Sequence, residues 1–220
     1  LNNGVEFLNS AAEEELNYAQ TLGSRATYKT GDFSFDGSVY FQTGKIFDNS
    51  VSANYFGGNV KYKASEQFNL GVGVEYLSGK DMDDTSAKIK SFNPVFGTNH
   101  KFNGFMDYFY VGNHANSVGL LDVNATLGYS KNNFSAKLIP HIFSSTADIY
   151  NAGSKESNNL GTEIDLVFGY KISKNVMLNS GFSKMFGTDS LEVLKGGDSS
   201  KNNSWTWLMI TFKPTLFSLK

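Results

Sequence analysis

The clearest alternation of apolar and polar positions lies between Gly119 and Ser144 (GLLDVNATLGYSKNNFSAKLIPHIFS). Apolar residues occupy every second position of 121–129 and again of 134–142, and mostly polar residues fill the positions between them. Lys131-Asn132-Asn133 separates the two runs and is typical of a tight turn. Because strand side chains alternate between two faces, the stretch predicts a β-hairpin with one apolar and one mostly polar face.

The same pattern recurs along the chain and predicts nine strands and no long helix. Residues 1–16, which include an acidic run, are expected to form a polar lead-in with a helical turn. In the third strand the alternation changes phase at residues 55–58, which predicts a β-bulge. The expected strands are 20–29, 33–43, 51–63, 68–76, 121–130, 134–142, 163–172, 176–185 and 204–212.

The connections between these strands alternate between short turns and mostly longer loops, as in bacterial outer-membrane barrels. Aromatic residues flank the short turns on the apolar face, where a lipid–water interface favours amphipathic rings. We therefore expect an all-β, antiparallel, up-and-down transmembrane β-barrel. A soluble lipocalin-like barrel or sandwich remains the alternative, because alternation alone does not distinguish inside from outside. The flanking aromatics are Tyr28, Phe33, Tyr62, Phe68, Tyr129, Phe134 and Tyr170.

Strand counting suggests an incomplete barrel. If the short turns are periplasmic, the last strand ends in the periplasm, whereas the first begins outside the cell. Single-chain bacterial barrels normally have an even number of strands. Nine strands therefore predict the C-terminal portion of a larger barrel, unless a further strand lies within 79–118. The whole of 1–220 is expected to be one barrel domain, and a chain that begins with Leu1 is expected to be mature, trimmed or incomplete.

Composition narrows the function classes. A formal net charge of −2 gives no reason to expect a nucleic-acid partner. The absence of cysteine excludes disulfides, thiolate catalysis and thiolate metal sites. No apolar run is long enough for a membrane helix, so any crossing of a membrane must be made by strands.

If the apolar face contacts lipid, the polar face lines a water-filled lumen. The side chains there carry charges of both signs, which suits polar solutes better than selection by one charge. Some of these residues could instead form salt bridges that brace the wall. The lumen-lining candidates are Arg25, Asp36, Lys61, Glu75, Asp122, Lys137, His141, Glu163 and Asp165.

The long segment 79–118 is expected to be an extracellular loop that folds inward. Its second half is rich in aromatic residues, which would be costly to expose to water. It would either pack against the inner wall or form a constriction that controls access and stacks on sugar rings. The candidates for that constriction are Phe96, His100, Phe105, Tyr108 and Tyr110.

No motif for catalysis, a metal or a cofactor is evident. Asp81-Met-Asp-Asp84 lacks the later oxygen ligands of a calcium loop. The three histidines have no metal-binding spacing. His141 and Ser144 are similar to a His and Ser of outer-membrane phospholipases, but no surrounding motif supports an enzyme. We expect no catalytic residue, no metal and no cofactor.

Several segments together resemble the alginate-export family of outer-membrane proteins, in the form found in Bacteroidetes. They cover residues 18–215 and are FGTNHKFNGFMDYF at 96–109, VGNH at 111–114, GLLD at 119–122, LGTEIDL at 160–166, LEVLKGGD at 191–198 and WTW at 205–207. The resemblance implies a Gram-negative outer-membrane barrel of about 18 strands, of which this chain would be the C-terminal half.

In the founding alginate exporters an arginine-rich lumen passes a polyanionic polysaccharide. This chain has a single arginine, Arg25, so the resemblance supports a porin better than it supports alginate as the solute. We expect passive diffusion of polar solutes or saccharides, with outer-membrane lipid as surroundings. A structural or accessory subunit, associated with other outer-membrane proteins, is the alternative.

Overall fold

The computed structural model describes residues 1–215 and 217, and its architecture is all-β. Ten strands form one sheet. A two-stranded hairpin and a short helix (α1, Asp189–Lys195) lie at one end of it, and a 3₁₀ turn (η1, Val111–Asn113) lies within the long segment 79–118. The sheet strands are β1 Asn2–Leu8, β2 Glu14–Thr30, β3 Phe33–Ile46, β4 Asn49–Lys63, β5 Phe68–Leu77, β6 Leu120–Lys131, β7 Phe134–Ser144, β10 Asn159–Ser173, β11 Val176–Gly187 and β12 Asn203–Phe212; the hairpin strands are β8 Tyr150–Asn151 and β9 Ser154–Lys155.

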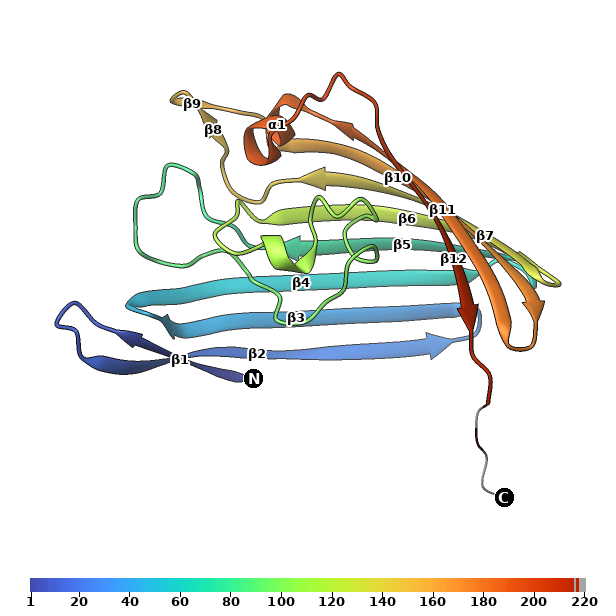
Figure 1. Cartoon of the computed structure of the whole chain (residues 1–220), viewed down its shortest axis with the longest axis horizontal. Coiled ribbons are helices and arrows are strands. Elements are labelled where there is room, and N and C mark those ends of the chain that lie inside the picture. Colours follow the sequence, from blue (N-terminus) through green and yellow to red (C-terminus); the bar gives the residue numbers. More distant parts are fainter. Residues whose placement is uncertain (216, 218–220) are drawn as a thin grey trace.

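The sheet has simple up-and-down topology. Its order is β1-β2-β3-β4-β5-β6-β7-β10-β11-β12, and every neighbouring pair is antiparallel. The sheet is curved, with segment 79–118 on its inner side (Figure 1). It is also open, because within residues 1–215 and 217 no ladder joins β1 to β12. The expected antiparallel topology is therefore confirmed.

The two faces of the sheet differ in polarity as the alternation predicts. The face away from segment 79–118, here called the outer face, exposes apolar side chains; Val72, for example, is 61% exposed. The opposite, inner face carries the buried polar residues Asp122, His141 and Glu163. Other exposed apolar residues of the outer face are Leu22, Phe35, Phe41, Leu70, Val74, Leu127, Leu138, Ile142 and Phe168.

The aromatic residues beside the short turns form a row across one end of the sheet. Phe33 stacks on Tyr62 with ring centroids 4.7 Å apart, and Phe68 lies 5.1 Å from Tyr129. Phe134 continues the row beside Tyr129 at 6.3 Å. Cross-strand aromatic pairs of this kind stabilise adjacent strands. The row places an amphipathic rim at the level of the short turns.

The expected polar lead-in is wrong. Residues 2–8 form β1, which pairs with Glu14–Gln20 of a longer β2, so the sheet has ten strands and not nine. Asn9 closes the connecting turn, since its Oδ1 accepts hydrogen bonds from the backbone N–H groups of Ala11 and Glu13. The acidic run interrupts the alternation, which is why the sequence did not predict this hairpin. With ten strands the count is even, so it no longer supports an incomplete barrel.

The predicted bulge in β4 is also wrong. The β3–β4 register runs without a shift from Ile46↔Asn49 to Phe33↔Tyr62. The apolar positions change face because Ala53 and Tyr55 point inward and pack under segment 79–118. The same register shortens the expected loop at 44–50 to a two-residue turn.

Candidate functional site

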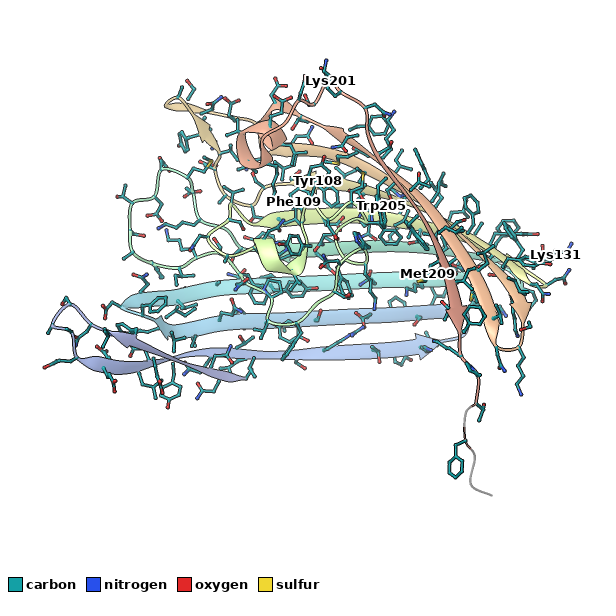
Figure 2. The ribbon with its side chains drawn as sticks, in the orientation of Figure 1. Tyr108, Phe109, Lys131, Lys201, Trp205 and Met209 are labelled. Atoms are coloured by element: carbon teal, nitrogen blue, oxygen red, sulfur yellow. The ribbon has the colours of Figure 1, made fainter. Side chains whose placement is uncertain are left out.

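Segment 79–118 lies across the inner face and contacts strands far apart in the sheet. At one side, Gln42 of β3 exchanges two hydrogen bonds with the backbone of Asn93. At the other side, Tyr108 bonds Asn203 of β12. Figure 2 shows Tyr108, Phe109 and Trp205 over the middle of the sheet, whereas Lys131 lies at the short-turn end. The segment therefore narrows the space enclosed by the curved sheet.

A tight turn at residues 103–106, here called the latch turn, seats this segment on the wall. The backbone N–H groups of Phe105 and Met106 both donate to Glu163 Oε1, at 2.6 and 2.9 Å. Gly104 has a φ of +85°, and a Cβ added there would lie 2.7 Å from the Glu163 carboxylate. Only glycine combines this conformation with so close an approach.

The neighbouring Asn103 connects the latch turn to two further carboxylates. Its Nδ2 donates to Glu75 Oε2 at 3.1 Å and to Asp122 Oδ2 at 3.2 Å. Asp122 in turn bonds His141 Nδ1 at 2.9 Å. Asp165 accepts a hydrogen bond from Ser183 Oγ of β11. Strands β5, β6, β7, β10 and β11 thus converge on one buried polar cluster beneath the latch turn.

An apolar layer surrounds this cluster. Phe109 packs on Phe143 of β7 with centroids 4.7 Å apart, and the His141 ring also stacks on Phe143. Lys195 of α1 lies over the Phe109 ring at 5.4 Å, and burial lowers the pKa of its amine. Excluding water from the polar cluster strengthens its hydrogen bonds and raises the cost of breaking any of them.

His100 lies at the tip of segment 79–118 and contacts both this segment and β12. Asp107 accepts from the His100 backbone N–H at 2.7 Å and pairs with its Nδ1 at 3.0 Å. The His100 ring stacks on Trp205 of β12, with centroids 4.4 Å apart and planes 21° from parallel. Trp207 lies beside Trp205, so aromatic rings line this part of the inner face.

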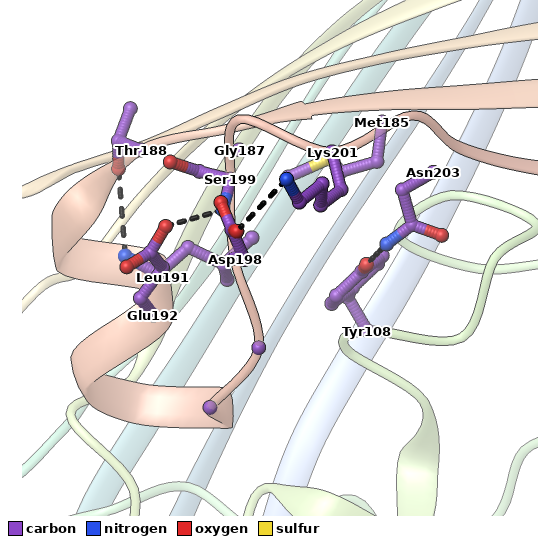
Figure 3. A pocket seen from close by; sticks show the side chains of 12 residues that line it. Tyr108, Met185, Gly187, Thr188, Leu191, Glu192, Asp198, Ser199, Lys201 and Asn203 are labelled. Atoms are coloured by element: carbon purple, nitrogen blue, oxygen red, sulfur yellow. Dashed lines mark hydrogen bonds and ion pairs between the residues drawn. The ribbon is translucent and has the colours of Figure 1, made fainter.

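A small pocket separates Tyr108 from α1 and the loop that follows it (Figure 3). The Glu192 carboxylate accepts the backbone N–H of Ser199, and hydrogen bonding by the side chain and backbone of this serine lowers the pKa of Glu192. The hydrogen bond between Tyr108 and Asn203 closes the opposite side. Hydrogen bonds thus connect residues of the pocket wall, and the bond between Tyr108 and Asn203 connects segment 79–118 to β12.

The sequence-predicted lumen residues divide into two groups. Glu75, Asp122, His141, Glu163 and Asp165 meet in the polar cluster and are partly or wholly buried. The others face the space nearer the short turns. Arg25 and Asp36 form an ion pair of 2.7 Å there, whereas Lys61 and Lys137 are exposed and lie within the same half of their strands.

The constriction candidates also differ in placement. Phe105 contributes its backbone to the latch turn, and His100 and Tyr108 reach β12. Phe96 is 83% exposed, and Tyr110 precedes η1 and is partly buried. Sequence reasoning did not single out Asn103, Gly104 and Ser183 as site residues, although Asn-Gly is itself a turn signal.

Acidic side chains outside the polar cluster make hydrogen bonds and ion pairs within the loops. Asp81 Oδ1 accepts the backbone N–H of Asp148, and Lys90 and Ser86 bond Asp84 and hold its pKa below the usual range. Across residues 1–215 and 217 no three His, Cys, Asp or Glu side chains are grouped so as to hold a metal. Ser144 lies on the face opposite His141, because their positions differ by an odd number in one strand.

His114 provides a pH-dependent test of how tightly the segment packs. It is 3% exposed, its Nε2–H donates to the Phe109 carbonyl oxygen, and burial lowers its pKa to about 4. The unfolded imidazole takes up its proton near pH 6.5, so we expect stability to fall from about pH 6.5 to about 4, by roughly 3 kcal/mol. Urea unfolding measured across this pH range gives the loss.

The control for this prediction is His114→Gln, which donates to the same carbonyl but does not titrate. Its unfolding free energy should change less between about pH 6.5 and 4 than that of the wild type. Parallel pH profiles for the two proteins would contradict a buried, neutral His114.

Comparison with known proteins supports transport. Within residues 1–215 and 217, no helix has the length and apolar character needed to cross a membrane. No curated protein matches the sequence. The sequence does match the model of the alginate export family over residues 6–206, nearly its whole length. This is a family of outer-membrane transport proteins and not of enzymes. The chain therefore belongs to the alginate export family.

Proposed function

We propose that the protein is an outer-membrane pore through which polar solutes or saccharides diffuse passively. The observation that carries this proposal is the contrast between the two faces of the sheet. The outer face exposes apolar side chains over its whole width and ends in a row of aromatic residues, as lipid-facing strands do. The inner face carries charged and polar side chains nearer the short turns, as the wall of a water-filled lumen does, and packs against segment 79–118 nearer the long loops.

The open sheet is, on this proposal, part of a larger barrel in the outer membrane of a Gram-negative bacterium. The ladder of β1 extends only to the pair Leu1 and Thr21, so Leu22–Thr30 of β2 have no strand partner on that side within the described residues. The edge strand β1 covers only the long-loop half of β2. Both β2 and β12 run from the long-loop end to the short-turn end, so the uncovered half of β2 could meet β12 only by parallel pairing. Lipid permits no unpaired strand edge.

Further antiparallel strands between these two edges satisfy that requirement. A barrel of about 18 strands, with this chain as its C-terminal half, is the arrangement we favour. The support for it is now the direction and pairing of β2 and β12, in place of the odd strand count that the sequence suggested.

The proposed solute class follows from the charges of the inner wall. Arg25, Lys61, Lys137 and Asp36 present both signs toward the lumen, and Arg25 is already paired with Asp36. Such a wall suits neutral or weakly charged polar solutes better than a polyanion. Segment 79–118 is the proposed constriction, with the His100 and Trp205 rings available for stacking on sugar rings.

A second function is favoured by the dense packing of segment 79–118, which bonds to β3, β5, β6, β10 and β12. A barrel filled in this way could serve as a structural subunit of an outer-membrane assembly. Conductance in planar bilayers, measured on the protein with all of its strands, distinguishes the two. We expect an open, ohmic pore; silence over a range of voltages would favour the structural subunit.

A further inference from the structure

Two carboxylate oxygens under the latch turn have no hydrogen-bond partner. They are Glu163 Oε2 and Asp165 Oδ2, and both residues are 0% exposed. The two side chains are two positions apart on β10 and therefore lie next to each other on the same face of the sheet. Two ionised carboxylates in contact without water repel strongly, so this arrangement requires a positive charge or a proton between them.

No lysine or arginine supplies that charge. Around the pair stand Glu75 of β5, Asp122 of β6, His141 of β7 and Tyr108 of the segment, while β11 and β12 present only Ser183 and Trp205. Within the described residues no lysine or arginine forms an ion pair with any of these carboxylates. His141 Nδ1 is bound to Asp122, and its Nε2 lies 3.7 Å from Asp165.

A metal ion does not fit this position either. The described part of the chain contains no metal-holding group of three or more such side chains. The nearest backbone groups at Glu163 are the N–H donors of Phe105 and Met106, which would repel a cation. A shared proton, unlike a metal ion, needs only two carboxylate oxygens as partners.

We propose that one proton shared between Glu163 Oε2 and Asp165 Oδ2 holds the latch turn on the inner wall, and that its loss at alkaline pH releases the turn and widens the pore. The inference rests on the proposed function, because it regulates that constriction. When the proton leaves, the two carboxylates repel each other. Movement of the Glu163 side chain then takes Oε1 away from the two backbone N–H groups.

Single-channel conductance as a function of pH tests this proposal on the protein with all of its strands. Between about pH 7 and 9.5, above the range in which a histidine ordinarily titrates, wild-type conductance should rise at least about twofold. Glu163→Gln and Asp165→Asn each replace the shared proton with an amide hydrogen, so both should stay at the low conductance. Glu66→Gln, on an exposed turn, should keep the wild-type profile.

A thiol probe measures the movement independently of conductance. The chain contains no cysteine, and Met185 is 3% exposed beside Tyr108, so Met185→Cys places a single thiol under the segment. At one alkaline pH, a charged maleimide should modify this thiol about tenfold more slowly when Asp165→Asn is also present, because closed segments protect buried sites.

The outcomes are separable. No conductance at any pH would overturn the proposed pore. Conductance without pH dependence, or variants Glu163→Gln and Asp165→Asn that keep the wild-type pH profile, would overturn the shared proton while leaving the pore intact. Loss of the closed state on adding a chelator at constant pH would assign the charge to a metal and also overturn the proposal.

Discussion

Replacing Gly104 by alanine should unseat the latch turn and open segment 79–118. The substitution forces an L residue into φ +85° and places its Cβ 2.7 Å from the Glu163 carboxylate. The backbone strain costs about 1 kcal/mol and the overpacking about 1–3 kcal/mol more. Lys101, exposed near the tip, then becomes a better trypsin site, and cleavage there should accelerate by roughly tenfold to a hundredfold.

Gly153 offers a matched control. Its φ is also +85°, but a Cβ added there meets nothing within 4 Å. Gly153→Ala therefore introduces the same backbone strain without the collision, and it lies in the β8–β9 hairpin, away from the latch turn. Cleavage at Lys101 should stay at the wild-type rate. Equal acceleration by both substitutions would mean that contact with Glu163 does not hold the segment.

Introducing arginine on the outer face should impair assembly into a membrane, whereas arginine on the inner face should be tolerated. Val72 on β5 is 61% exposed and points outward. If that face contacts lipid, Val72→Arg costs about 2–4 kcal/mol near the bilayer centre. In a soluble β protein the same exposed position would accept arginine within about 0.5 kcal/mol. The fraction of heat-modifiable, folded protein in outer-membrane fractions measures the difference.

Thr126 supplies the inward-facing comparison. It lies on the adjacent strand, pairs with Gly71, and has free space on that side because Gly71 has no side chain. Thr126→Arg should fold and insert like the wild type and alter only the charge of the lumen. If Thr126→Arg prevents insertion and Val72→Arg does not, the assignment of lipid to the outer face is wrong.

Much of the sheet is predictable because each strand carries its own period-two pattern. The faces of Leu138, Lys137 and their neighbours follow from alternation alone. The β1 hairpin escapes this reasoning, since the acids at 13–15 interrupt the pattern and the turn depends on one asparagine side chain. The phase change in β4 is misleading for another reason: Ala53 and Tyr55 pack on a segment that follows much later in the sequence.

The candidate site is only half predictable for a related reason. Alternation places Glu75, Asp122, Glu163 and Asp165 on the inner face and the aromatic content of 91–118 favours an inward fold. That these acids converge under Asn103 depends on the path of a long loop, which no local pattern encodes. Sequence reasoning therefore found the participants and missed their burial.

The attachment of one segment to both β3 and β12 has a mechanical consequence. Gln42 holds it at one side of the curved sheet, and Asn203 and Trp205 hold it at the other. A segment attached at two points of a curved sheet fixes the distance between those points and so sets how strongly the sheet is curved. The bending of these ten strands is thus fixed within the chain itself, independent of any seam that joins their edges.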